Sequence, residues 1–296
     1  MQAMILAAGL GTRLKPHTLI RPKPLFPILN QPLLLLTIKR LQNIGFDRII
    51  VNCHHLKEQM VAALNGIKGV IIQEEEIILG TGGGLRTALE HMRDEPLLIT
   101  NGDIYHTIDF EAFYQYHIAN GALVTLAMHN FPRFNKVMIK EGKIASFDNK
   151  VEFSQLAFTG LHVINPTILK TIAVDKYSCI IDHYRYLLND GIDIACYRAD
   201  DCFWTDMGTP EDYLNLHQGL LKEDIPCWQE AKPARKPYCI DKKAKLPASI
   251  DLADWACIGD AKIEDGTHLE RVVVWDDVFI PAASRLVDRI VSTKIE

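Results

Sequence analysis

The segment Leu6-Ala7-Ala8-Gly9-Leu10-Gly11-Thr12-Arg13-Leu14, at residues 6–14, is the part of the sequence that decides the fold. It overlaps a short apolar run, Met4–Ala8, that has the composition of a buried β-strand. Gly9 and Gly11 allow the backbone to turn sharply and to bring N–H groups close to phosphate oxygens. Arg13 adds a fixed fork of hydrogen-bond donors for the same phosphates. The segment therefore indicates a strand that ends in an anion-binding loop.

Two common nucleotide-binding motifs do not fit this loop. A dinucleotide fingerprint needs a third glycine where Leu14 stands, and an acidic residue at the end of the second strand, where Asn52 stands. A P-loop needs Gly-Lys-Ser/Thr, which the segment lacks. Downstream, Pro22-Lys23-Pro24-Leu25 places a lysine between two prolines, which stiffen the backbone and present the ammonium group at a defined place. A phosphate site of another kind is expected.

The first half of the chain alternates short apolar runs with helical periodicity. The expected strands are Met4–Ala8, Arg48–Asn52, Val70–Gln73 and Pro96–Thr100, and the expected helices are Leu33–Ile44, Leu56–Leu64 and Gly83–Met92. This alternation predicts an α/β fold, a doubly wound and mostly parallel Rossmann-like sheet with right-handed crossovers. Ligands bind such sheets outside the carboxyl ends of the strands, where the glycine-rich loop and Asp103 both lie.

The pattern becomes β-rich between residues 122 and 163. Strands are expected at 123–128, 136–140, 143–147 and 157–163, helices at 166–172, 181–189 and 210–221, and further strands at 193–197 and 202–206. Residues 224–247 are rich in Pro, Lys and Glu, which predicts a linker. We therefore predict a large domain at 1–223, a linker at 224–247 and a small domain at 248–296.

The small C-terminal domain has a repeating aliphatic pattern. Its members recur every five or six residues: Ile258, Ile263, Leu269, Val274, Ile280 and Leu286. This resembles the hexapeptide repeats of a left-handed parallel β-helix, although a small irregular β appendage would also fit. About two coils would leave an open end that another subunit would cover, so a homo-oligomer such as a dimer is expected.

Composition bounds the remaining possibilities. The 296 residues are 48% hydrophobic and 23% charged, and their formal net charge of −5 argues against nucleic acid or an anionic membrane as partner. The cysteines at 53, 179, 196, 202, 227, 239 and 257 are never spaced as CxxC and indicate reduced thiols. We expect a cytoplasmic protein, since Met1–Ala8 lacks a basic n-region and no stretch has the length of a membrane span.

Several motifs together resemble one family. Leu6–Leu14, Pro22–Leu25, Leu79-Gly80-Thr81-Gly82-Gly83, Asn101-Gly102-Asp103 and Trp204-Thr205-Asp206-Met207-Gly208-Thr209 stand in the order seen in sugar-1-phosphate nucleotidyltransferases. The resemblance covers about residues 1–220, and the tail is similar to the short β-helix of some sugar-nucleotide pyrophosphorylases. It implies an enzyme that takes a nucleoside triphosphate and a sugar 1-phosphate. Its product would be a nucleotide sugar, for example one used to make cell-envelope polysaccharide.

The resemblance also implies roles for individual residues. Arg13 and Lys23 would be catalytic, because they neutralise phosphate charge near the reacting centre. The nucleotide-binding set would be Leu6, Ala8, Gly9, Gly11, Thr12, Arg13, Gln73, Thr81, Gly82 and Asn101. Glycines at 80–84 would let the nucleobase lie on the backbone, although they also fit the start of a helix. His54-His55 follow a strand and are expected to pack or hydrogen-bond rather than to catalyse.

The cofactor implied by the resemblance is Mg²⁺, held by Asp103 and Asp206. Hard cations prefer carboxylate oxygens, and Mg²⁺ commonly takes one or two carboxylates together with phosphates and water. The sugar-phosphate oxygen would attack the α-phosphorus in line and pyrophosphate would leave. Since that oxygen is already ionised at neutral pH, no general base is required, and the work of the protein is positioning and charge neutralisation.

The sugar phosphate is expected over the β-rich segment. Thr159 and Gly160 resemble the position where a small residue admits the sugar ring. Lys150 and Glu152 stand where relatives carry Glu-Lys-Pro, an altered pattern, and would bind the phosphate and the sugar. The motifs fit guanylyltransferases for mannose- or heptose-1-phosphate, and also a uridylyltransferase for N-acetylmuramate 1-phosphate. A cytidylyl- or adenylyltransferase and a non-catalytic regulatory paralogue that binds sugar nucleotides are the remaining alternatives.

Overall fold

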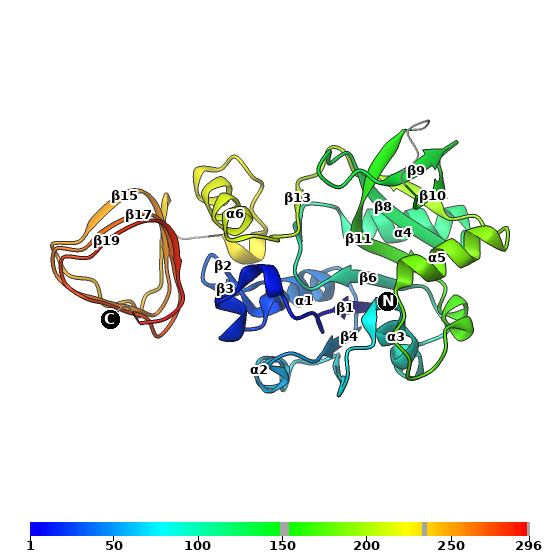
Figure 1. Cartoon of the computed structure of the whole chain (residues 1–296), viewed down its shortest axis with the longest axis horizontal. Coiled ribbons are helices and arrows are strands. Elements are labelled where there is room, and N and C mark those ends of the chain that lie inside the picture. The colour runs from blue at the N-terminus through cyan, green and yellow to red at the C-terminus, as the bar shows by residue number, and fades with distance from the viewer. Residues whose placement is uncertain (149–153, 233–235, 295–296) are drawn as a thin grey trace. The chain divides into compact units, whose positions relative to one another are not determined.

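The computed structural model describes residues 1–148, 154–232 and 236–294 (Figure 1). The chain divides into two compact units, which are described separately. The first consists of Met1–Leu10 and Thr37–Trp204, and the second of Gly11–Leu36 and Thr205–Glu296. The segment 11–36 therefore packs with the C-terminal part of the chain, although it lies early in the sequence.

The first unit contains a mixed sheet in the order β5-β4-β1-β6-β11-β8-β12-β10-β9. The strands are β1 (Gln2–Leu6), β4 (Arg48–Cys53), β5 (Val70–Glu74), β6 (Leu97–Asn101), β8 (Val124–His129), β9 (Val137–Lys140), β10 (Lys143–Ser146), β11 (Gln155–Ile164) and β12 (Ala195–Arg198); the short strands are β7 (Tyr105–His106) and β13 (Trp204–Thr205). Strands β5, β4, β1 and β6 are parallel, as the alternating pattern predicts. The α/β class is confirmed for this half.

The expectation of a mostly parallel sheet is wrong for the other half. Strand β11 runs antiparallel to both β6 and β8, and β10 runs antiparallel to β9 and β12. Among the described strands of that half, β8 and β12 pair in parallel. For β9 and β10 the physical reason is the two-residue turn Glu141-Gly142 that joins them, because strands joined by so short a turn run antiparallel.

Helices flank this sheet. They are α1 (Leu33–Asn43), α2 (Lys57–Leu64), α3 (Gly80–Thr87), α4 (Phe110–Asn120) and α5 (Ile180–Asn189), with 3-10 turns η4 (Ala88–His91) and η5 (Pro166–Thr171). The sequence reading omitted α4, which begins where the Asp109 carboxylate accepts hydrogen bonds from the N–H groups of Glu111 and Ala112. Among the described residues, no helix combines the length and apolarity that crossing a bilayer requires.

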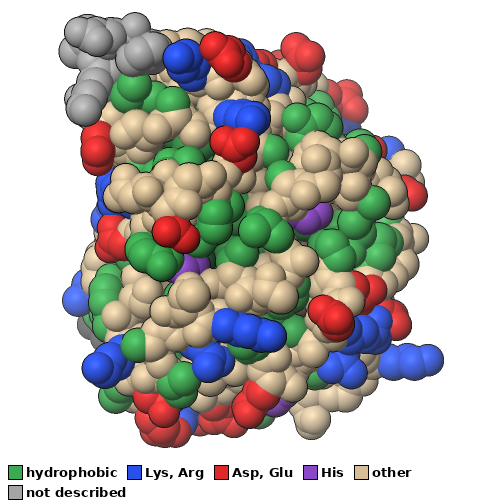
Figure 2. Space-filling view, turned by 90° about the vertical axis from the view of Figure 1, so that its right-hand side faces the viewer, with side chains coloured by type: hydrophobic (Ala, Val, Ile, Leu, Met, Phe, Trp, Pro, Cys, Tyr) green, Lys and Arg blue, Asp and Glu red, His purple; other side chains and the backbone are tan. Residues whose placement is uncertain are grey.

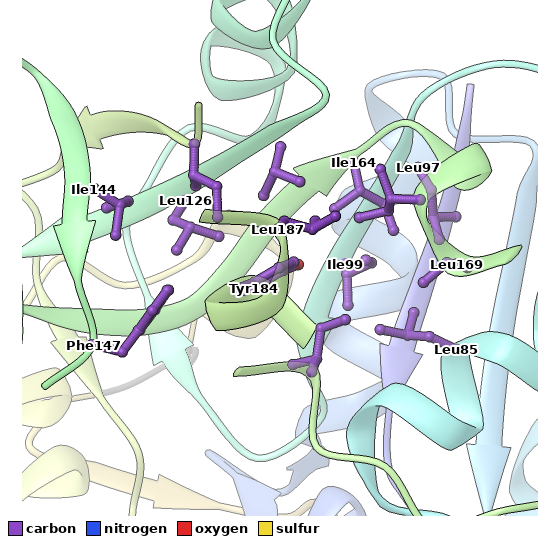
Figure 3. Packing of buried hydrophobic residues seen from close by; sticks show 14 of the residues in the cluster. Leu85, Leu97, Ile99, Leu126, Ile144, Phe147, Ile164, Leu169, Tyr184 and Leu187 are labelled. Atoms are coloured by element: carbon purple, nitrogen blue, oxygen red, sulfur yellow. The ribbon is translucent and has the colours of Figure 1, made fainter. Parts of the chain in front are cut away.

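The core of the first unit lies between the sheet and α5. Leu97 and Ile99 of β6, together with Leu126 of β8, are fully buried and face Tyr184 and Leu187 of α5 (Figure 3). Burying each aliphatic side chain of this kind contributes roughly 1.5–3 kcal/mol. The β-rich half of the sheet is thereby fixed to α5, the helix that begins just after Ser178 and Cys179.

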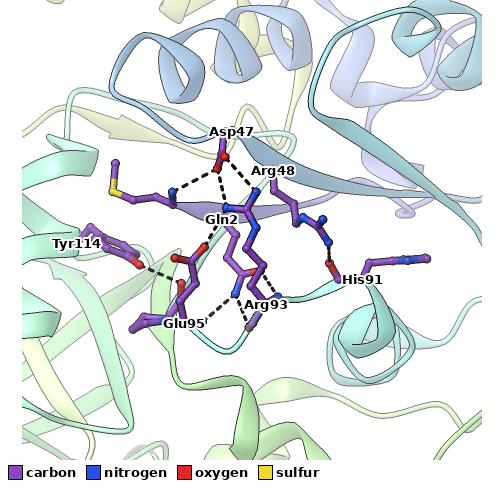
Figure 4. A network of polar contacts seen from close by, with 9 residues as sticks. Gln2, Asp47, Arg48, His91, Arg93, Glu95 and Tyr114 are labelled. Atoms are coloured by element: carbon purple, nitrogen blue, oxygen red, sulfur yellow. Dashed lines mark hydrogen bonds and ion pairs between the residues drawn. The ribbon is translucent and has the colours of Figure 1, made fainter.

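A polar network fixes the start of β1. The Gln2 amide donates to the carbonyls of Arg93 and Glu95 at 2.9 and 2.7 Å. Arg93 makes two hydrogen bonds to the Asp47 carboxylate at 2.8 and 3.0 Å (Figure 4). The Arg93 hydrogen bonds lower the pKa of the exposed Asp47 carboxyl below its usual range. The network holds β1 in register with its neighbours, and the other end of β1 leads into the glycine-rich loop.

One face of the molecule mixes both signs of charge. Figure 2 shows acidic and basic side chains interspersed over it, with hydrophobic side chains between them. Interspersed charges of opposite sign leave no extended field of one sign on this face.

The second unit combines the segment 11–36 with a coil of parallel strands. Its elements are η1 (Thr12–Leu14), η2 (His17–Leu19), η3 (Lys23–Leu25), β2 (Pro27–Ile28), β3 (Gln31–Pro32), α6 (Pro210–Lys222), η6 (Gln229–Ala231), β14 (Tyr238–Ile240), β15 (Asp251–Ile258), β16 (Lys262–Ile263), β17 (His268–Val274), β18 (Phe279–Ile280) and β19 (Arg285–Val291). The α6 start is capped by Thr209, whose hydroxyl accepts from the Asp212 N–H at 3.1 Å.

The C-terminal strands are parallel and regularly spaced. Asp251 of β15 aligns with His268 of β17, and His268 aligns with Arg285 of β19. Strands β16 and β18 pair in parallel as a second sheet, and Figure 1 shows the whole stretch winding as stacked coils. Strand β14 pairs with β15, so part of the segment 224–247, which we predicted to be a linker, belongs to this coil.

Candidate active site

The loop after β1 contains a glycine with open space beside it. Gly9 is exposed, and a Cβ built on it meets no heavy atom of the described chain within 4 Å. The packing of the protein therefore does not explain this glycine. Open space beside an exposed backbone is what a phosphate cradle needs, because a ligand oxygen can approach the N–H groups.

Gly11, in contrast, is required by the chain itself. Its φ of 60° lies in the left-handed region, and a Cβ there would lie 2.8 Å from Thr18 Cγ2 and 3.4 Å from Lys23 Cβ. Gly11 begins the turn η1 that carries Arg13. The close packing at Gly11 thus brings the turn with Arg13 against the segment that carries Lys23.

Arg13, Lys23 and Asp206 converge within the second unit. Arg13 Nη2 lies 3.2 Å from Asp206 Oδ2, and Lys23 Nζ donates to the Asp206 carbonyl at 2.7 Å. Lys23 is only 5% exposed, whereas the Arg13 side chain is 59% exposed. Two cations of the segment 11–36 therefore meet Asp206, which lies far away in the sequence: Arg13 at its carboxylate and Lys23 at its backbone carbonyl. Their roles in catalysis stay predictions.

The turn after Asp206 makes room for Arg13. The Gly208 N–H donates to Asp206 Oδ1 at 3.1 Å. A Cβ on Gly208 would overlap Arg13 Nη1 and lie 2.8 Å from Asp206 Oδ2. Met207, between them, has a φ of 44°, an unfavourable conformation for a residue with a side chain. Strained backbone of this kind is typical of functional sites, where surrounding contacts hold it in place.

Asp103 lies in the first unit, directly after β6. Gly102 packs on the end of β1, since its N–H donates to the Leu6 carbonyl at 2.8 Å and a Cβ would lie 3.2 Å from Ala7 Cβ. The half-buried Asp103 is thereby attached to the base of the glycine-rich loop. Among the described residues, no three His, Cys, Asp or Glu side chains form a metal-binding group. Mg²⁺ requires fewer, because phosphates and water complete its coordination.

A bulge in β11 brings together Asn101, Thr159 and Gly160. The register of β11 against β8 shifts between Phe158 and His162. Gly160 in this bulge has a φ of 80°, and a Cβ there would lie 2.5 Å from Asn101 Nδ2. Thr159 is buried, and its hydroxyl donates to the Ala127 carbonyl at 2.8 Å. The structure thus places a predicted nucleotide residue beside the predicted sugar residues.

Trp204 supports this bulge, a role that the sequence reading did not assign. Its indole N–H donates to the Thr159 carbonyl at 2.8 Å. Phe131 and Phe134 contact its ring at centroid distances of 5.5 and 5.8 Å. The signal was present, because Trp204 begins the motif that ends in Thr209, but the motif by itself does not reveal a partner in β11.

Asn52 joins two loops, and the sequence reading also omitted this role. Its amide oxygen accepts from the Ala7 N–H at 2.7 Å, and its amide nitrogen donates to Glu75 Oε1 at 2.8 Å. Glu75 is 3% exposed, and its Oε2 accepts from the Leu79 N–H at 3.3 Å. The beginning of the loop after β1 and the beginning of the 79–84 loop are therefore held by one buried polar network.

The 79–84 loop is covered by the segment 176–180. The N–H groups of Gly82 and Gly83 lie 2.8 and 3.2 Å from the Ser178 carbonyl. The exposed Thr81 accepts the Ile180 N–H on its hydroxyl at 3.0 Å. Cβ atoms on Gly82 and Gly83 would lie 2.8 Å from Ser178 Oγ and 2.6 Å from the Lys176 carbonyl. Chain packing therefore explains these glycines without a nucleobase.

Gln73 is also engaged within the protein. Its amide nitrogen donates to the Gly84 carbonyl at 3.0 Å, and the side chain is 6% exposed. Its amide oxygen is buried without a hydrogen-bond partner among the described atoms. His54, beside this network, contacts the Glu75 carbonyl through Nδ1 at 2.8 Å, in line with the expectation that it hydrogen-bonds. Lys150 and Glu152 lie outside the described residues.

Two buried histidines connect α5 to its neighbours. His162 of β11 is fully buried and contacts the Tyr184 hydroxyl through Nδ1. Burial lowers the pKa of His162 to about 3, because the charged imidazolium would lose its hydration. His183 of α5 has a lowered pKa for the same reason. His162 thus joins β11 to α5, whereas His183 joins α5 to η5 through a contact of Nε2 with the Ile168 carbonyl at 2.9 Å.

The sequence model of the nucleotidyl transferase family matches residues 2–223. This match includes the loop after β1, the convergence of Arg13 and Lys23 on Asp206, and the bulge at Gly160. The chain belongs to the nucleotidyl transferase family. It is a sugar-1-phosphate nucleotidyltransferase, as the motifs predict.

Curated relatives cover nearly the whole of this nucleotidyltransferase. It is 28% identical to the mannose-1-phosphate guanylyltransferase of Mycobacterium tuberculosis over 95% of this chain and 82% of the relative. It is also 28% identical to the UTP–glucose-1-phosphate uridylyltransferase of Synechocystis sp., over 98% of this chain and 87% of the relative. The family is therefore clear, while these two relatives differ in both nucleotide and sugar.

Solved structures share the fold. HddC from Yersinia pseudotuberculosis is 23% identical, with a TM-score of 0.62 over 73% of this nucleotidyltransferase and 97% of that chain. A putative glucose-1-phosphate thymidylyltransferase from Bacillus anthracis is 19% identical, with a TM-score of 0.67 over 78% and 98%. Because both structures are less than 25% identical to this chain, the similarity shows a shared α/β fold.

Proposed function

We propose that this nucleotidyltransferase catalyses a Mg²⁺-dependent in-line displacement between a nucleoside triphosphate and a sugar 1-phosphate. A phosphate oxygen of the sugar phosphate attacks the α-phosphorus and forms the new P–O bond. The bond between the α-phosphorus and the bridging oxygen breaks, and pyrophosphate leaves with that electron pair. The products are a nucleoside-diphosphate sugar and pyrophosphate, so no proton transfer by a side chain is required.

The observation that carries this proposal is the convergence of Arg13 and Lys23 on Asp206. Lys23, buried beside the Asp206 carbonyl, would present one fixed positive charge to the phosphates. The exposed Arg13 would add two or more donors to their oxygens. The open backbone at Gly9 would complete the cradle. Such preorganised charge stabilises the transition state more than the ground state.

The donors fit a hard divalent cation. Asp103 and Asp206 would hold Mg²⁺, which supplies charge neutralisation at the phosphate oxygens when it is bound. The Asp206 carboxylate already accepts the Gly208 N–H on Oδ1 and pairs with Arg13 through Oδ2. If the carboxylate held Mg²⁺, the exposed Arg13 guanidinium beside it would be within reach of the phosphates that the ion binds.

For the substrates we favour GTP with mannose- or heptose-1-phosphate. This choice is supported by relatives named mannose-1-phosphate guanylyltransferase in a bacterium and in Dictyostelium discoideum. The alternative is UTP with N-acetylmuramate 1-phosphate or another hexose 1-phosphate, which the uridylyltransferase relative favours. A single base is selected by a few hydrogen bonds, so close relatives can differ.

The sugar would lie at the β11 bulge. Thr159 and Gly160 leave little side-chain bulk beside Asn101, and the indole of Trp204 keeps the bulge in place. Lys150 and Glu152 stay the proposed ligands of the sugar phosphate and of a sugar hydroxyl. Testing Lys150→Ala against Thr159→Val would separate phosphate binding from accommodation of the ring.

A non-catalytic protein that binds sugar nucleotides is the alternative of another class. In a protein that has lost its catalytic activity, the charged side chains that act only in the reaction are expected to be replaced first. Arg13, Lys23 and Asp206 are all present and lie together, which favours the enzyme.

The proposal is tested by a matrix of triphosphates and sugar 1-phosphates with detection of pyrophosphate. GTP with mannose- or heptose-1-phosphate should give the highest kcat/KM, and EDTA should abolish turnover. Equal turnover in EDTA would exclude the metal requirement. Release of pyrophosphate with UTP and N-acetylmuramate 1-phosphate alone would replace the favoured substrates with the alternative.

We further propose that the C-terminal coil is a left-handed β-helix and that the chain forms a homo-oligomer through its end. The handedness is supported by the aliphatic repeat and by parallel strands aligned one coil apart. Sedimentation of the full chain gives its assembly directly. A mass equal to one subunit of 33.4 kDa would contradict the oligomer.

A further inference from the structure

The phosphate-binding segment rests on the C-terminal coil. Residues 11–36, which contain Arg13 and Lys23, form one compact unit with residues 205–296. A sequence division at residue 223 would assign the segment and the coil to separate domains. The contacts between them are therefore relevant to how the two cations are positioned.

Trp275, just after β17, lies at the centre of these contacts. It is 1% exposed, and Phe26 meets its ring edge-on with centroids 4.7 Å apart. Arg21 Cζ lies 4.8 Å from the centre of the same ring, a cation–π contact. The Trp275 indole N–H donates to the Tyr213 hydroxyl at 3.3 Å, so α6 also contacts it.

Polar contacts join the coil to the segment on both sides of Lys23. On one side, Arg21 pairs with Asp276 at 3.7 Å, and His17 Nδ1 lies 2.7 Å from Ser292 Oγ. On the other side, the Asn30 amide donates to the Ile258 carbonyl at 2.8 Å.

Short links connect these contacts to the two cations. The Phe26 N–H donates to the Lys23 carbonyl at 3.0 Å, closing the turn η3. Lys23 Cβ in turn lies beside Gly11, the residue that begins the turn with Arg13. A displacement of Phe26 would therefore move Lys23 directly and Arg13 through Gly11.

We propose that Trp275 is a positioning residue for Lys23 and Arg13, so that the C-terminal coil is a working part of the nucleotide site. The inference rests on the proposed role of these cations in binding the triphosphate. Trp275 touches no substrate in this account. It fixes Phe26 and Arg21, and thereby holds the Lys23 ammonium at the place where phosphate charge develops. Misplacement of a charged group by about 1 Å can reduce turnover by roughly 10²-fold.

The test compares three variants of the full chain. Trp275→Leu removes the ring, Trp275→Phe keeps an aromatic ring for Phe26 and Arg21, and Ile263→Ala is the control. Ile263 is 3% exposed in the same coil but belongs to the separate β16–β18 sheet. The control therefore loosens the coil without removing the ring that contacts the segment.

Steady-state kinetics should separate positioning from loss of folded protein. For Trp275→Leu we expect kcat to fall about 10- to 100-fold and KM for the triphosphate to rise, with KM for the sugar phosphate unchanged. Trp275→Phe should recover most of both parameters. If only the amount of folded protein changed, kcat would fall while both KM values stayed at the wild-type level, and the positioning role would be refuted.

Hydrogen exchange gives a readout that does not depend on activity. In Trp275→Leu, amides of residues 11–26 should lose protection, whereas Ile263→Ala should leave them protected. Equal loss in both variants, or unchanged protection in Trp275→Leu, would overturn the proposal. If Trp275→Leu does not fold, the same comparison is made with Asp276→Asn, which removes the charge facing Arg21 and keeps an Oδ1 acceptor for the Asp260 N–H. A wild-type chain inactive with every substrate pair would refute the proposed function and leave this exchange test standing.

Discussion

The chain contains two glycine-rich loops whose glycines are explained by different neighbours. In the loop after β1, Gly9 faces open space, whereas Gly11 packs closely against Thr18. In the 79–84 loop, Cβ atoms on Gly82 and Gly83 would collide with residues 176–179 of the same chain. The backbone at Gly9 is therefore open to a ligand, whereas the protein itself encloses Gly82 and Gly83.

The comparison teaches that a glycine motif has no single meaning. In both loops the sequence shows glycines at the start of a helical turn, and in both the family resemblance suggests a bound nucleotide. Only the neighbouring atoms separate a glycine kept for a ligand from one kept for close backbone packing. Substitution of Gly9 should therefore reduce activity, whereas substitution of Gly83 should reduce stability.

The largest expected effect belongs to Lys23. Lys23→Ala should reduce turnover by about 10³-fold, because a fixed positive charge at the phosphates is lost. Thermal unfolding should show that the variant is folded. Lys57→Ala is the matched control, since Lys57 pairs with Glu74 and Glu76 on the surface, and it should change turnover less than about twofold. Wild-type turnover in Lys23→Ala would show that Lys23 does not stabilise phosphate charge during the reaction.

The second effect compares one glycine from each loop. Gly9→Ala should keep wild-type stability and raise KM for the triphosphate about 10-fold, since the methyl group enters space kept for a phosphate. Gly83→Ala should lose about 1–3 kcal/mol of unfolding free energy, because a Cβ 2.6 Å from the Lys176 carbonyl forces the backbone apart. Urea unfolding and initial-rate kinetics measure both quantities. Loss of stability in Gly9→Ala together with a raised KM in Gly83→Ala would contradict the roles given to these two glycines.

The third prediction concerns how acidic pH lowers the free energy of unfolding through His162, which contacts α5. His162 contacts Tyr184 of α5, and its folded-state pKa of about 3 lies below the unfolded value of 6.5. Stability from the neutral ring is present above pH 6.5 and is lost as the pH falls toward the folded-state pKa. At pH 5 the loss should be about 2 kcal/mol.

The measurement for this third effect is urea unfolding at pH 7 and pH 5. His162→Gln cannot bind the proton, so its stability should change by about 2 kcal/mol less than that of the wild-type chain between the two pH values. An identical change in both proteins would mean that His162 is not kept neutral by burial.

The smallest effect is expected at the surface network beside β1. Asp47→Asn removes the charge that faces Arg93 in Figure 4. The pair is exposed to solvent, so the midpoint of thermal unfolding should fall by less than about 2 °C and turnover should stay unchanged. Calorimetry and pyrophosphate release check these two expectations, and a large loss of activity would show that β1 transmits strain to the first loop.

Much of the fold could be predicted because local patterns agree with it. The run of strands and helices from Arg48 to Asn101 was predicted to within a few residues, since each apolar run is bounded by a turn signal. Helix α4 was missed because apolar residues lie on more than one side of it, as Phe110, Tyr116 and Ile118 show. Its Asp109 cap and the left-handed Gly121 at its end were the usable signals.

The site was predictable where one motif contains its own chemistry. Arg13, Lys23 and Asp206 stand in distinctive local patterns, so their proximity could be predicted, while their roles stay predictions. Asn52 and Trp204 were missed as supporting residues, because their partners Ala7 and Thr159 lie on other strands. The dependence of Lys23 on Trp275 is of the same kind: it is a contact between distant segments, and no local pattern contains it.

The most direct test of the account is pyrophosphate release by Asp206→Asn over a range of Mg²⁺ concentrations, with Asp47→Asn as the matched control. Asparagine keeps the Oδ1 acceptor for the Gly208 N–H and removes the charge that pairs with Arg13 and that would bind the proposed Mg²⁺. We predict that turnover falls by about 10²–10³-fold and that half-maximal activity requires more Mg²⁺. Wild-type turnover at wild-type Mg²⁺ concentration would contradict the account.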